Sequence, residues 1–234
     1  SAKLPKAGQN NIGSDLPHQR ADGLDKRTRL DEVAQALDDE YLLRELQAPL
    51  VLTGPVNLRH DPRFRAVPGN FRLALLYNVP VWHRIDGAIQ PAPDGVRVLK
   101  DLYQRRREDA GIPEDLIGEA LVEQAAQSCA GIVRDFLGLL HEAGKNALSR
   151  GQRLVDAADV EAAIKTRRLE MEGYLDEQEI EILSRVHDKG TLPGSPEADT
   201  LLFENFIACY HNGDIWFRPH DLIVSFIALH REEP

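Results

Sequence analysis

The chain has 234 residues, a formal net charge of −10 and 42% hydrophobic residues. This share of apolar residues is enough to build hydrophobic cores, so a wholly disordered chain is excluded, and the length favours two or three small domains. No apolar run approaches the roughly 18 residues that a membrane-spanning helix needs. The start of the chain is polar, so no signal peptide is expected, and the predicted localisation is cytoplasmic.

The first 92 residues are predicted to form a linker and part of an α/β core. Residues 1–20 are rich in Gly, Asn, Pro and Lys and have no apolar period, which is typical of a linker or disordered start. In residues 21–92, a helical apolar pattern is followed by short β-prone runs at 50–53 and 79–82. The spacing of these runs suits a crossover connection, so we expect two parallel strands.

Residues 93–175 are predicted to form a helical lid. Apolar residues recur at helical spacing along most of this region. Pro113 is expected to begin one helix, and Ser128 is expected to cap another at 128–148. A further helix is predicted to start at Asp156 or just after it, with Val160, Ile164 and Leu169 on its inward face.

Residues 176–234 are predicted to form a winged-helix domain, whose first helix is expected to stop near Gly190. Its helices are followed by two β-prone runs, 206–210 and 215–217, which flank an Asn-Gly dipeptide. Asn-Gly between such runs is the strongest short-range signal for a β-hairpin. The predicted fold class is therefore α+β and mostly helical, with a partial parallel α/β core, a helical lid bundle and a C-terminal winged helix with a β-hairpin.

The acidic excess is confined to the C-terminal third of the chain. Residues 1–155 hold 21 acidic and 21 basic residues, whereas residues 156–234 hold 17 acidic and 7 basic residues. DNA-binding modules gain much of their affinity by neutralising phosphates. This charge disfavours DNA as the partner of the winged helix and favours a protein partner, without removing DNA from the alternatives.

Common catalytic and metal-binding motifs are missing from the sequence. It contains no G-x-x-x-x-G-K-[ST] phosphate loop, no G-x-G-x-x-G, no H-E-x-x-H and no G-x-S-x-G. The two cysteines, Cys129 and Cys209, have apolar neighbours, so we expect buried thiols rather than a disulfide or a zinc site. His141 is expected to be exposed or half-buried, and His220 to be a cap or turn residue.

From residue 21 onward, the order of motifs resembles the C-terminal part of a AAA+/STAND-type P-loop ATPase, on the branch near the origin-recognition and signalling ATPases. The resemblance implies an ATP-dependent molecular switch, in which the lid and the winged helix couple nucleotide state to protein partners or to a homo-oligomer. The segments that carry it are A-D-G-L-D-K at 21–26, L-V-L-T-G-P at 50–55, V-P-V-W at 79–82, C-A-G-I-V-R-D-F-L at 129–137 and F-I-A-C-Y-H-N-G-D-I-W-F at 206–217.

The resemblance also implies roles for individual residues toward ATP and Mg²⁺. Asp22 and Asp25 would be the catalytic acids of a Walker B segment, with Asp25 as a magnesium ligand. Thr53 would occupy the sensor-1 position at the end of its strand. Arg134 would be the sensor-2 arginine, because a guanidinium pairs bidentately with phosphate oxygens and keeps its charge. Arg59 and Arg63 would be candidate arginine fingers.

Two departures from the family pattern leave alternatives open. The phosphate loop is missing, and the residues before Asp22 are polar, whereas a Walker B acid normally ends a buried strand. Residues 21–26 can therefore be a loop without a magnesium role. Arg59, Arg63 and Arg134 can be solvated surface charges.

These departures also shape the expected activity. This chain by itself is expected neither to bind ATP tightly nor to hydrolyse it, so ATPase activity would need a phosphate-loop half. The alternative functions are a winged-helix DNA-binding regulator and an interaction scaffold with no nucleotide role.

Overall fold

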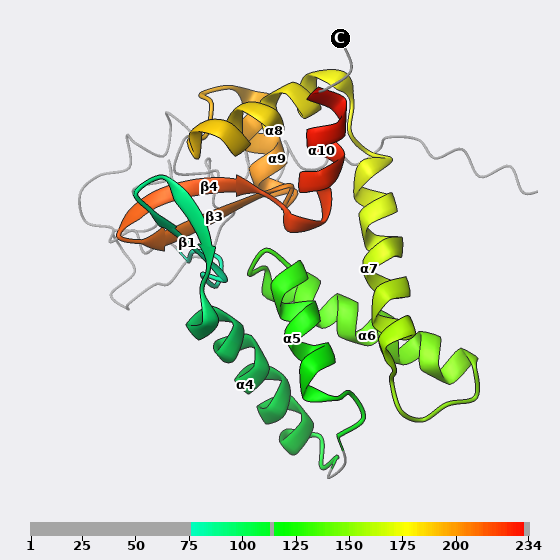
Figure 1. The fold of residues 1–234 in the computed structure, drawn as a ribbon. Coiled ribbons are helices and arrows are strands. Elements are labelled where there is room, and N and C mark those ends of the chain that lie inside the picture. Colours follow the sequence, from blue (N-terminus) through cyan, green and yellow to red (C-terminus); the bar gives the residue numbers. More distant parts are fainter. Residues whose placement is uncertain (1–75, 113–114, 232–234) are drawn as a thin grey trace, which may run out of the picture. The chain divides into compact units, whose positions relative to one another are not determined.

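The computed structural model describes residues 76–112 and 115–231, which belong to one compact unit. Helices dominate these residues, and both of their sheets are two-stranded and antiparallel (Figure 1). This confirms the prediction of a mostly helical α+β fold. In chain order the elements are β1 Trp82–Ile85, β2 Ala88–Pro91, α4 Pro93–Asp109, α5 Glu119–Ser128, α6 Val133–Ser149, α7 Ala157–Glu172, α8 Glu177–Lys189, α9 Pro196–Phe203, β3 Ile207–Asn212, β4 Asp214–Pro219, the 3₁₀ helix η2 Asp221–Ile223 and α10 Val224–Arg231.

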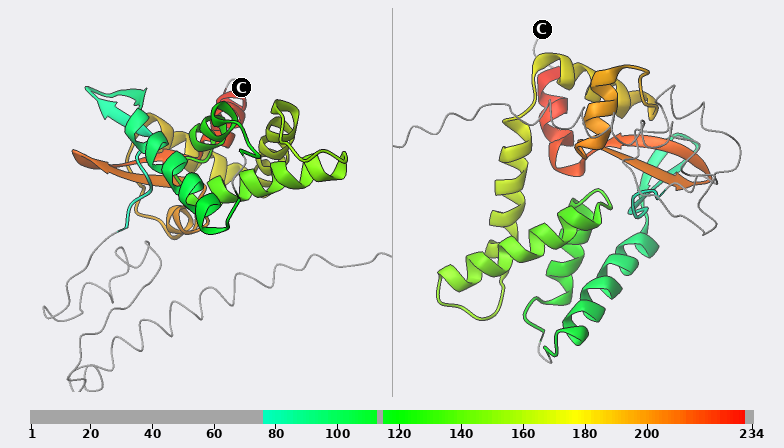
Figure 2. Two further views of the ribbon diagram at one scale, coloured as in Figure 1. Left: turned by 90° about the horizontal axis from the view of Figure 1, so that it is seen from below. Right: turned by 180° about the vertical axis from the view of Figure 1, so that it is seen from behind.

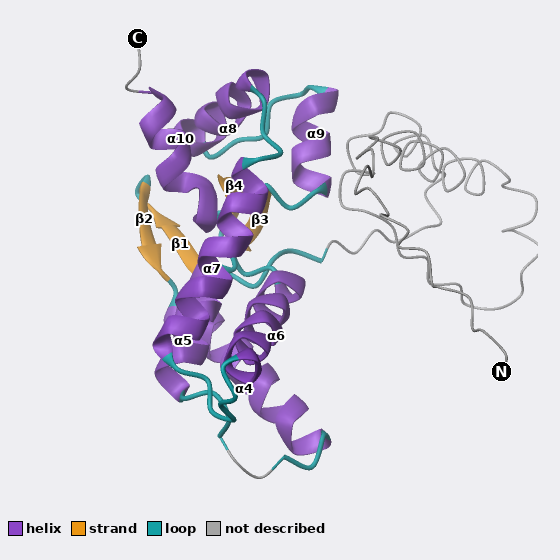
Figure 3. Cartoon of the chain, turned by 90° about the vertical axis from the view of Figure 1, so that its right-hand side faces the viewer, coloured by secondary structure: helices purple, strands orange, loops and turns teal. Residues whose placement is uncertain are grey.

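Two hydrophobic cores organise the described residues. The first core is built mainly from α4, α5, α6 and α7, and it also takes in Tyr210 and Trp216 from the β3–β4 hairpin. The second core is built from α8, α9, α10 and the same hairpin. Helix α7 lies between the two groups of helices (Figure 3), and its Ile164 packs against both cores. The two cores therefore meet along α7 and the hairpin.

The helix termini carry the signals that the sequence predicts. Asp156 caps α7 and forms a reciprocal capping box with Asp159. Gly190 ends α8 in the left-handed conformation, with a φ of 65°. Both ends are as predicted. Leu169 is an exception, because the predicted inward face of α7 leaves this side chain 53% exposed. No helix of the described residues is both long enough and apolar enough to cross a membrane.

The prediction for the start of α6 is wrong. Ser128 is the last residue of α5, and its hydroxyl donates to the Gln124 carbonyl instead of capping the next helix. Ala130 and Gly131 adopt positive φ and separate α5 from α6, whose N-cap is Ile132. Gly131 is required here, because a Cβ at this position would collide with the Val79 carbonyl.

The predicted start of the preceding helix is also wrong. Helix α5 begins at Glu119, well after Pro113. Between them, Ile117 forms a parallel bridge with Val155, and the Val155 N–H donates to the Leu116 carbonyl. The backbone of this stretch thus pairs with the chain just before α7 and does not continue a helix.

The β-prone run at 79–82 does not form the predicted parallel strand. Strand β1 begins at Trp82 and pairs antiparallel with β2 in register from Trp82–Pro91 to Ile85–Ala88. Asp86 and Gly87 both have positive φ and close the hairpin, as a two-residue turn of primed type requires. The other predicted strand, 50–53, lies outside the described residues.

The C-terminal hairpin confirms the Asn-Gly prediction. Strands β3 and β4 pair from Ile207–Pro219 to Asn212–Asp214, and Gly213 at their turn has a φ of 107°. Helix α8 packs against β4, α9 packs against β3, and α10 packs against α8 and η2. The β1–β2 hairpin lies beside β3–β4 (Figure 2), because the Asn212 side chain donates to the Trp82 carbonyl.

Candidate functional site

Arg134 is the one predicted nucleotide-site residue that lies within the described part of the chain. It is in the first turn of α6, and its side chain is exposed. The exposed guanidinium is compatible both with a free surface charge and with an arginine that meets an anion. The other predicted site residues lie outside the described residues: Asp22, Asp25, Thr53, Arg59 and Arg63.

The residue after Arg134 is the centre of a buried ionic cluster. Asp135 is 8% exposed. Its Oδ2 lies 3.1 Å from Nε2 of His220, the N-cap of η2, and its Oδ1 lies 3.5 Å from Nη2 of Arg167 on α7. The Asp135–His220 contact lacks the alignment of a hydrogen bond, so it is chiefly electrostatic. One carboxylate therefore joins α6, α7 and the chain leading into α10.

The hydrogen bonds of His220 define its tautomer. The ring is fully buried, and its Nδ1 accepts a hydrogen bond from the Leu222 N–H at 3.2 Å. A ring nitrogen that accepts a hydrogen bond carries no proton, so the proton of the neutral ring is on Nε2, the atom that faces Asp135. This confirms the prediction that His220 caps a turn, and it adds a second partner on α6.

The environment of Asp135 keeps it ionised. Burial raises the pKa of this carboxyl, but His220 and the charges of Arg167 and Arg134 together outweigh burial and bring the pKa below its ordinary value. The exposed guanidinium of Arg134 thus contributes to the field around a buried carboxylate. A change in the charge around Arg134 would change the electrostatic potential at Asp135 and, through Asp135, the contact with His220.

A second cluster lies on the other side of His220, around Asp221. Its Oδ1 is 2.8 Å from Nη2 of Arg218, and its Oδ2 accepts a hydrogen bond of 2.7 Å from the indole N–H of Trp82. The Arg218 guanidinium also lies over the Trp82 ring, 4.2 Å from its centroid. This arrangement fastens β1 to the end of the β3–β4 hairpin.

The pKa values of Asp221 and Asp135 are shifted in opposite directions. Burial raises the pKa of Asp221, and the favourable contacts with Arg218, Trp82 and His220 do not fully offset it. Two carboxyls with opposite pKa shifts are a feature of acid–base sites. Here, however, the histidine between them is fully buried, so the cluster connects structural elements and does not present a reactive group to a substrate.

Asn212 and Tyr210 extend this polar network across the β3–β4 hairpin. Asn212 donates to the Trp82 carbonyl at 2.8 Å and accepts from the indole N–H of Trp216 at 2.7 Å. The Tyr210 hydroxyl donates to the Ala130 carbonyl at 2.8 Å, in the loop between α5 and α6. The hairpin is therefore bonded both to β1 and to the segment that leads into Arg134.

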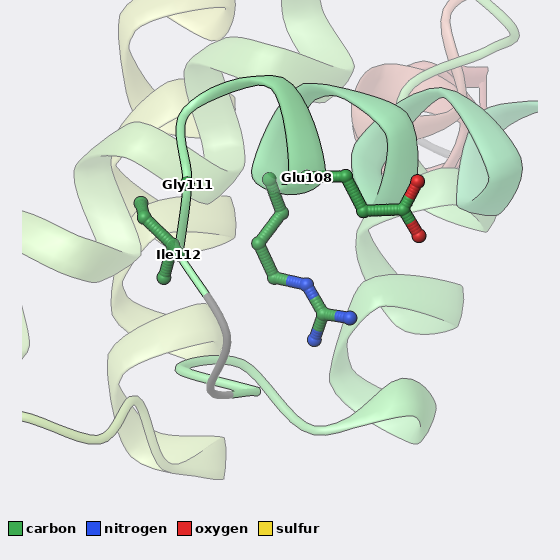
Figure 4. Close-up of a pocket in the computed structure, with 4 residues that line it drawn as sticks. Glu108, Gly111 and Ile112 are labelled. Atoms are coloured by element: carbon green, nitrogen blue, oxygen red, sulfur yellow. The ribbon is translucent and has the colours of Figure 1, made fainter.

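The described residues contain no group of three His, Cys, Asp or Glu side chains that could hold a metal ion. At the end of α4, a hollow of about 370 Å³ is lined by Arg107, Glu108, Gly111 and Ile112 (Figure 4). Three of these residues are exposed, and Arg107 is paired with Asp115. The hollow is thus an open depression at the surface, and the arginine that lines it is already paired.

Comparisons with protein-family models, with curated proteins and with solved structures find no match to the chain.

Sequence reasoning identified Arg134 but missed the residues that connect it to the hairpin. One signal was available, because Asp135 follows Ile132 by three positions and precedes Leu139 by four, which places an acid on the apolar face of α6. An acid on a buried face predicts a cationic or hydrogen-bonding partner. No comparable local signal pairs Trp82 with Asp221, since these residues are 139 positions apart.

Proposed function

We propose that this chain is the sensing half of an ATP-dependent switch of the AAA+/STAND type, in which the first turn of α6 senses nucleotide and the C-terminal hairpin and helices engage a protein partner. The proposal rests on the motif order and on one structural relationship. Exposed Arg134 is adjacent to buried Asp135, and Asp135 contacts His220 at 3.1 Å. An anion bound at Arg134 would weaken the electrostatic attraction between Arg134 and Asp135 and thereby change the contact of Asp135 with His220.

The location of Arg134 favours an anionic ligand. The N-terminal turn of a helix carries a partial positive charge, and Arg134 adds a full charge there. Its planar guanidinium suits the oxygens of a triphosphate. When bound, MgATP would supply the negative charge that this turn detects, with Asp25 proposed as the magnesium ligand. A separate or upstream phosphate-loop half would supply most of the nucleotide affinity and any hydrolysis.

An NMR titration of the full chain with MgATP tests the proposal. The Nε signal of Arg134 and the ring signals of His220 should shift together, with weak affinity. Arg134→Gln removes the arginine signal itself and should abolish the shift at His220, whereas Asp135→Asn should retain the shift at Arg134 and abolish the shift at His220. Arg97→Gln is the matched control, because Arg97 is an exposed arginine that pairs with exposed Asp94 on α4.

Two outcomes of the titration would contradict the proposal. If MgATP shifted neither signal at millimolar concentration, or if the His220 shift persisted in Arg134→Gln, the first turn of α6 would not be a nucleotide sensor. Micromolar binding by this chain in a calorimeter would contradict the assignment of most of the affinity to a separate half.

A scaffold without a nucleotide role is the second candidate, and one observation favours it. Arg134 already acts on Asp135 through its charge, so it has a structural use that needs no ligand. This alternative predicts that Arg134→Gln changes the stability of the chain slightly and leaves partner binding independent of ATP. A DNA-binding role is less well supported, since α9 has two acidic residues and no Lys or Arg.

A further inference from the structure

The β1–β2 hairpin, residues 82–91, is held to the rest of the unit mainly through one of its strands. None of its side chains is fully buried, and the tip and most of β2 are exposed. Ile89 is the exception in β2, because it is half-buried against the first core. We call residues 82–91 the strap.

Polar contacts fasten β1 to three separate elements. The Trp82 indole donates to Asp221 in η2, and the Trp82 carbonyl accepts from Asn212 at the end of β3. The Arg84 guanidinium donates to the Lys189 carbonyl at 3.0 Å, at the C-terminus of α8. Gly190 leaves room for this contact, since a Cβ there would collide with the Arg84 guanidinium. The strap therefore bridges the C-terminal helices and the hairpin.

The two ends of the strap are firmly placed. Val81 and Ala92 are both buried, and the Ala92 N–H donates to the Val81 carbonyl at 2.8 Å. Gly95 at the start of α4 approaches the Pro80 backbone so closely that a Cβ would collide with it. Val81 belongs to the first core, and the strap extends from this neck at Val81 and Ala92.

No residue of the strap is among the buried residues of either core, although Trp82 and Ile89 pack against the first core. Of the polar contacts of the strap, the one between Arg84 and Lys189 is exposed and those of Trp82 are half-buried. Contacts of this kind open at lower cost than fully buried apolar packing. We propose that the strap opens and closes as a local unit about its neck at Val81 and Ala92, and that its closed form couples the start of α4 to α8 and η2.

This coupling goes beyond the proposed switch, because it requires no nucleotide and no role for Arg134. In the closed form, a displacement of the chain before Val81 would be transmitted to the hairpin and to the end of α8. In the open form, that connection would be lost while the helices kept their packing.

Hydrogen exchange of the Trp82 indole N–H in the full chain tests this inference. The chain has two tryptophans, and the two indole signals are assigned by comparison with Trp82→Phe. Arg84→Ala removes one fastening of the strap, so it should accelerate exchange of the Trp82 indole about tenfold, the effect of losing one hydrogen bond to a charged group. Backbone amides of α6 should change less than about twofold, because they report on the first core.

Arg97→Ala is the matched arginine control, and it should leave the Trp82 indole unchanged. The inference fails if Arg84→Ala accelerates α6 amides as much as the Trp82 indole, since the strap would then open only when the whole unit unfolds. It also fails if Arg84→Ala leaves the Trp82 indole as slow as in the parent chain. Because no nucleotide is present, either failure is distinct from failure of the proposed switch.

Discussion

The Nε2 atom of His220 lies 3.1 Å from Oδ2 of Asp135, and this contact joins the residue before η2 to the first turn of α6. Both side chains are buried, so the pair is shielded from solvent and its interaction is stronger than that of a surface pair. Nearby residues of the chain belong to the two cores, since Phe136 packs in the first core and Leu222 in the second. Stability and signal transmission should therefore depend on the same two residues.

Loss of the Asp135 charge should destabilise the fold. Asp135→Asn keeps the size of the side chain but removes the negative charge that faces Nε2 of His220 and the guanidinium of Arg167, so we expect the free energy of unfolding to fall by about 1–3 kcal/mol. Urea unfolding followed by circular dichroism measures this change. Asp94→Asn is the control, because Asp94 forms an exposed pair on α4, and its effect should stay within about 0.5 kcal/mol. Equal effects of the two variants would contradict the structural importance of Asp135.

Lowering the pH should remove the contribution of Asp135 to the free energy of unfolding. The pKa of this carboxyl is lowered in the folded chain from an ordinary value of 3.8. Its contribution to stability is therefore fully present above that value and is lost as the pH falls through the lowered pKa. The difference in unfolding free energy between the parent chain and Asp135→Asn should shrink over this range. Urea unfolding at a series of pH values measures it, and a difference independent of pH would contradict the assignment.

Asp221 should show the opposite trend. Burial raises the pKa of this carboxyl above 3.8, so the folded state favours its protonated form. The stability of the parent chain relative to Asp221→Asn should consequently decrease as the pH rises from 3.8 through the raised pKa. The same urea series, applied to this variant, provides the measurement. A relative stability that rises with pH would show that Arg218 and Trp82 outweigh burial.

Cys129 should be inert in the folded chain. Burial raises the pKa of its thiol to about 12, and the side chain is inaccessible to solvent. Incubation with iodoacetamide at neutral pH should leave Cys129 unmodified, whereas the same reagent in urea should modify it. Peptide mass spectrometry measures the extent of reaction. Fast labelling of the folded chain would show that the loop after α5 opens readily.

Alanine substitution should change the stability of the fold in opposite directions at two glycines, one just before α6 and one inside it. Gly131 has a φ of 69° and no space for a Cβ, so Gly131→Ala should destabilise the fold by roughly 2 kcal/mol or more. Gly138 lies inside α6 with open space around it, so Gly138→Ala should stabilise the fold by about 0.5–1 kcal/mol. Thermal unfolding measures both. A loss of stability in Gly138→Ala would contradict the helix position assigned to it.

The elements that the sequence predicted well are those with local signals. Asp156 marks the start of α7 through its capping side chain, and Gly190 marks the end of α8 through its left-handed backbone. The dipeptide Asn212-Gly213 likewise marks a hairpin through its local turn preference. Cys129 and Cys209 are buried, and His141 is exposed, as their neighbours in the sequence indicated. Local chemistry of this kind acts within a few residues and can be recognised without the fold.

The predictions that failed involved competing or distant partners. Ser128 has the chemistry of an N-cap, but the positive φ values of Ala130 and Gly131 place the start of α6 further along. The run at 79–82 has the β-prone residues of a strand, but the Asp-Gly turn at 86–87 makes its partner the antiparallel strand β2 and not a distant parallel strand. The links of Asp135 to His220 and of Trp82 to Asp221 depend on tertiary packing, which no local pattern encodes.

The response of the His220 ring to MgATP tests the central claim most directly. The measurement is made on the full chain, in parallel with Arg134→Gln and Asp135→Asn. The switch proposal predicts a shift of the His220 signals in the parent chain and none in either variant. A His220 signal that MgATP leaves unchanged, or that shifts equally in Arg134→Gln, would contradict it and leave the interaction scaffold as the better description of the protein.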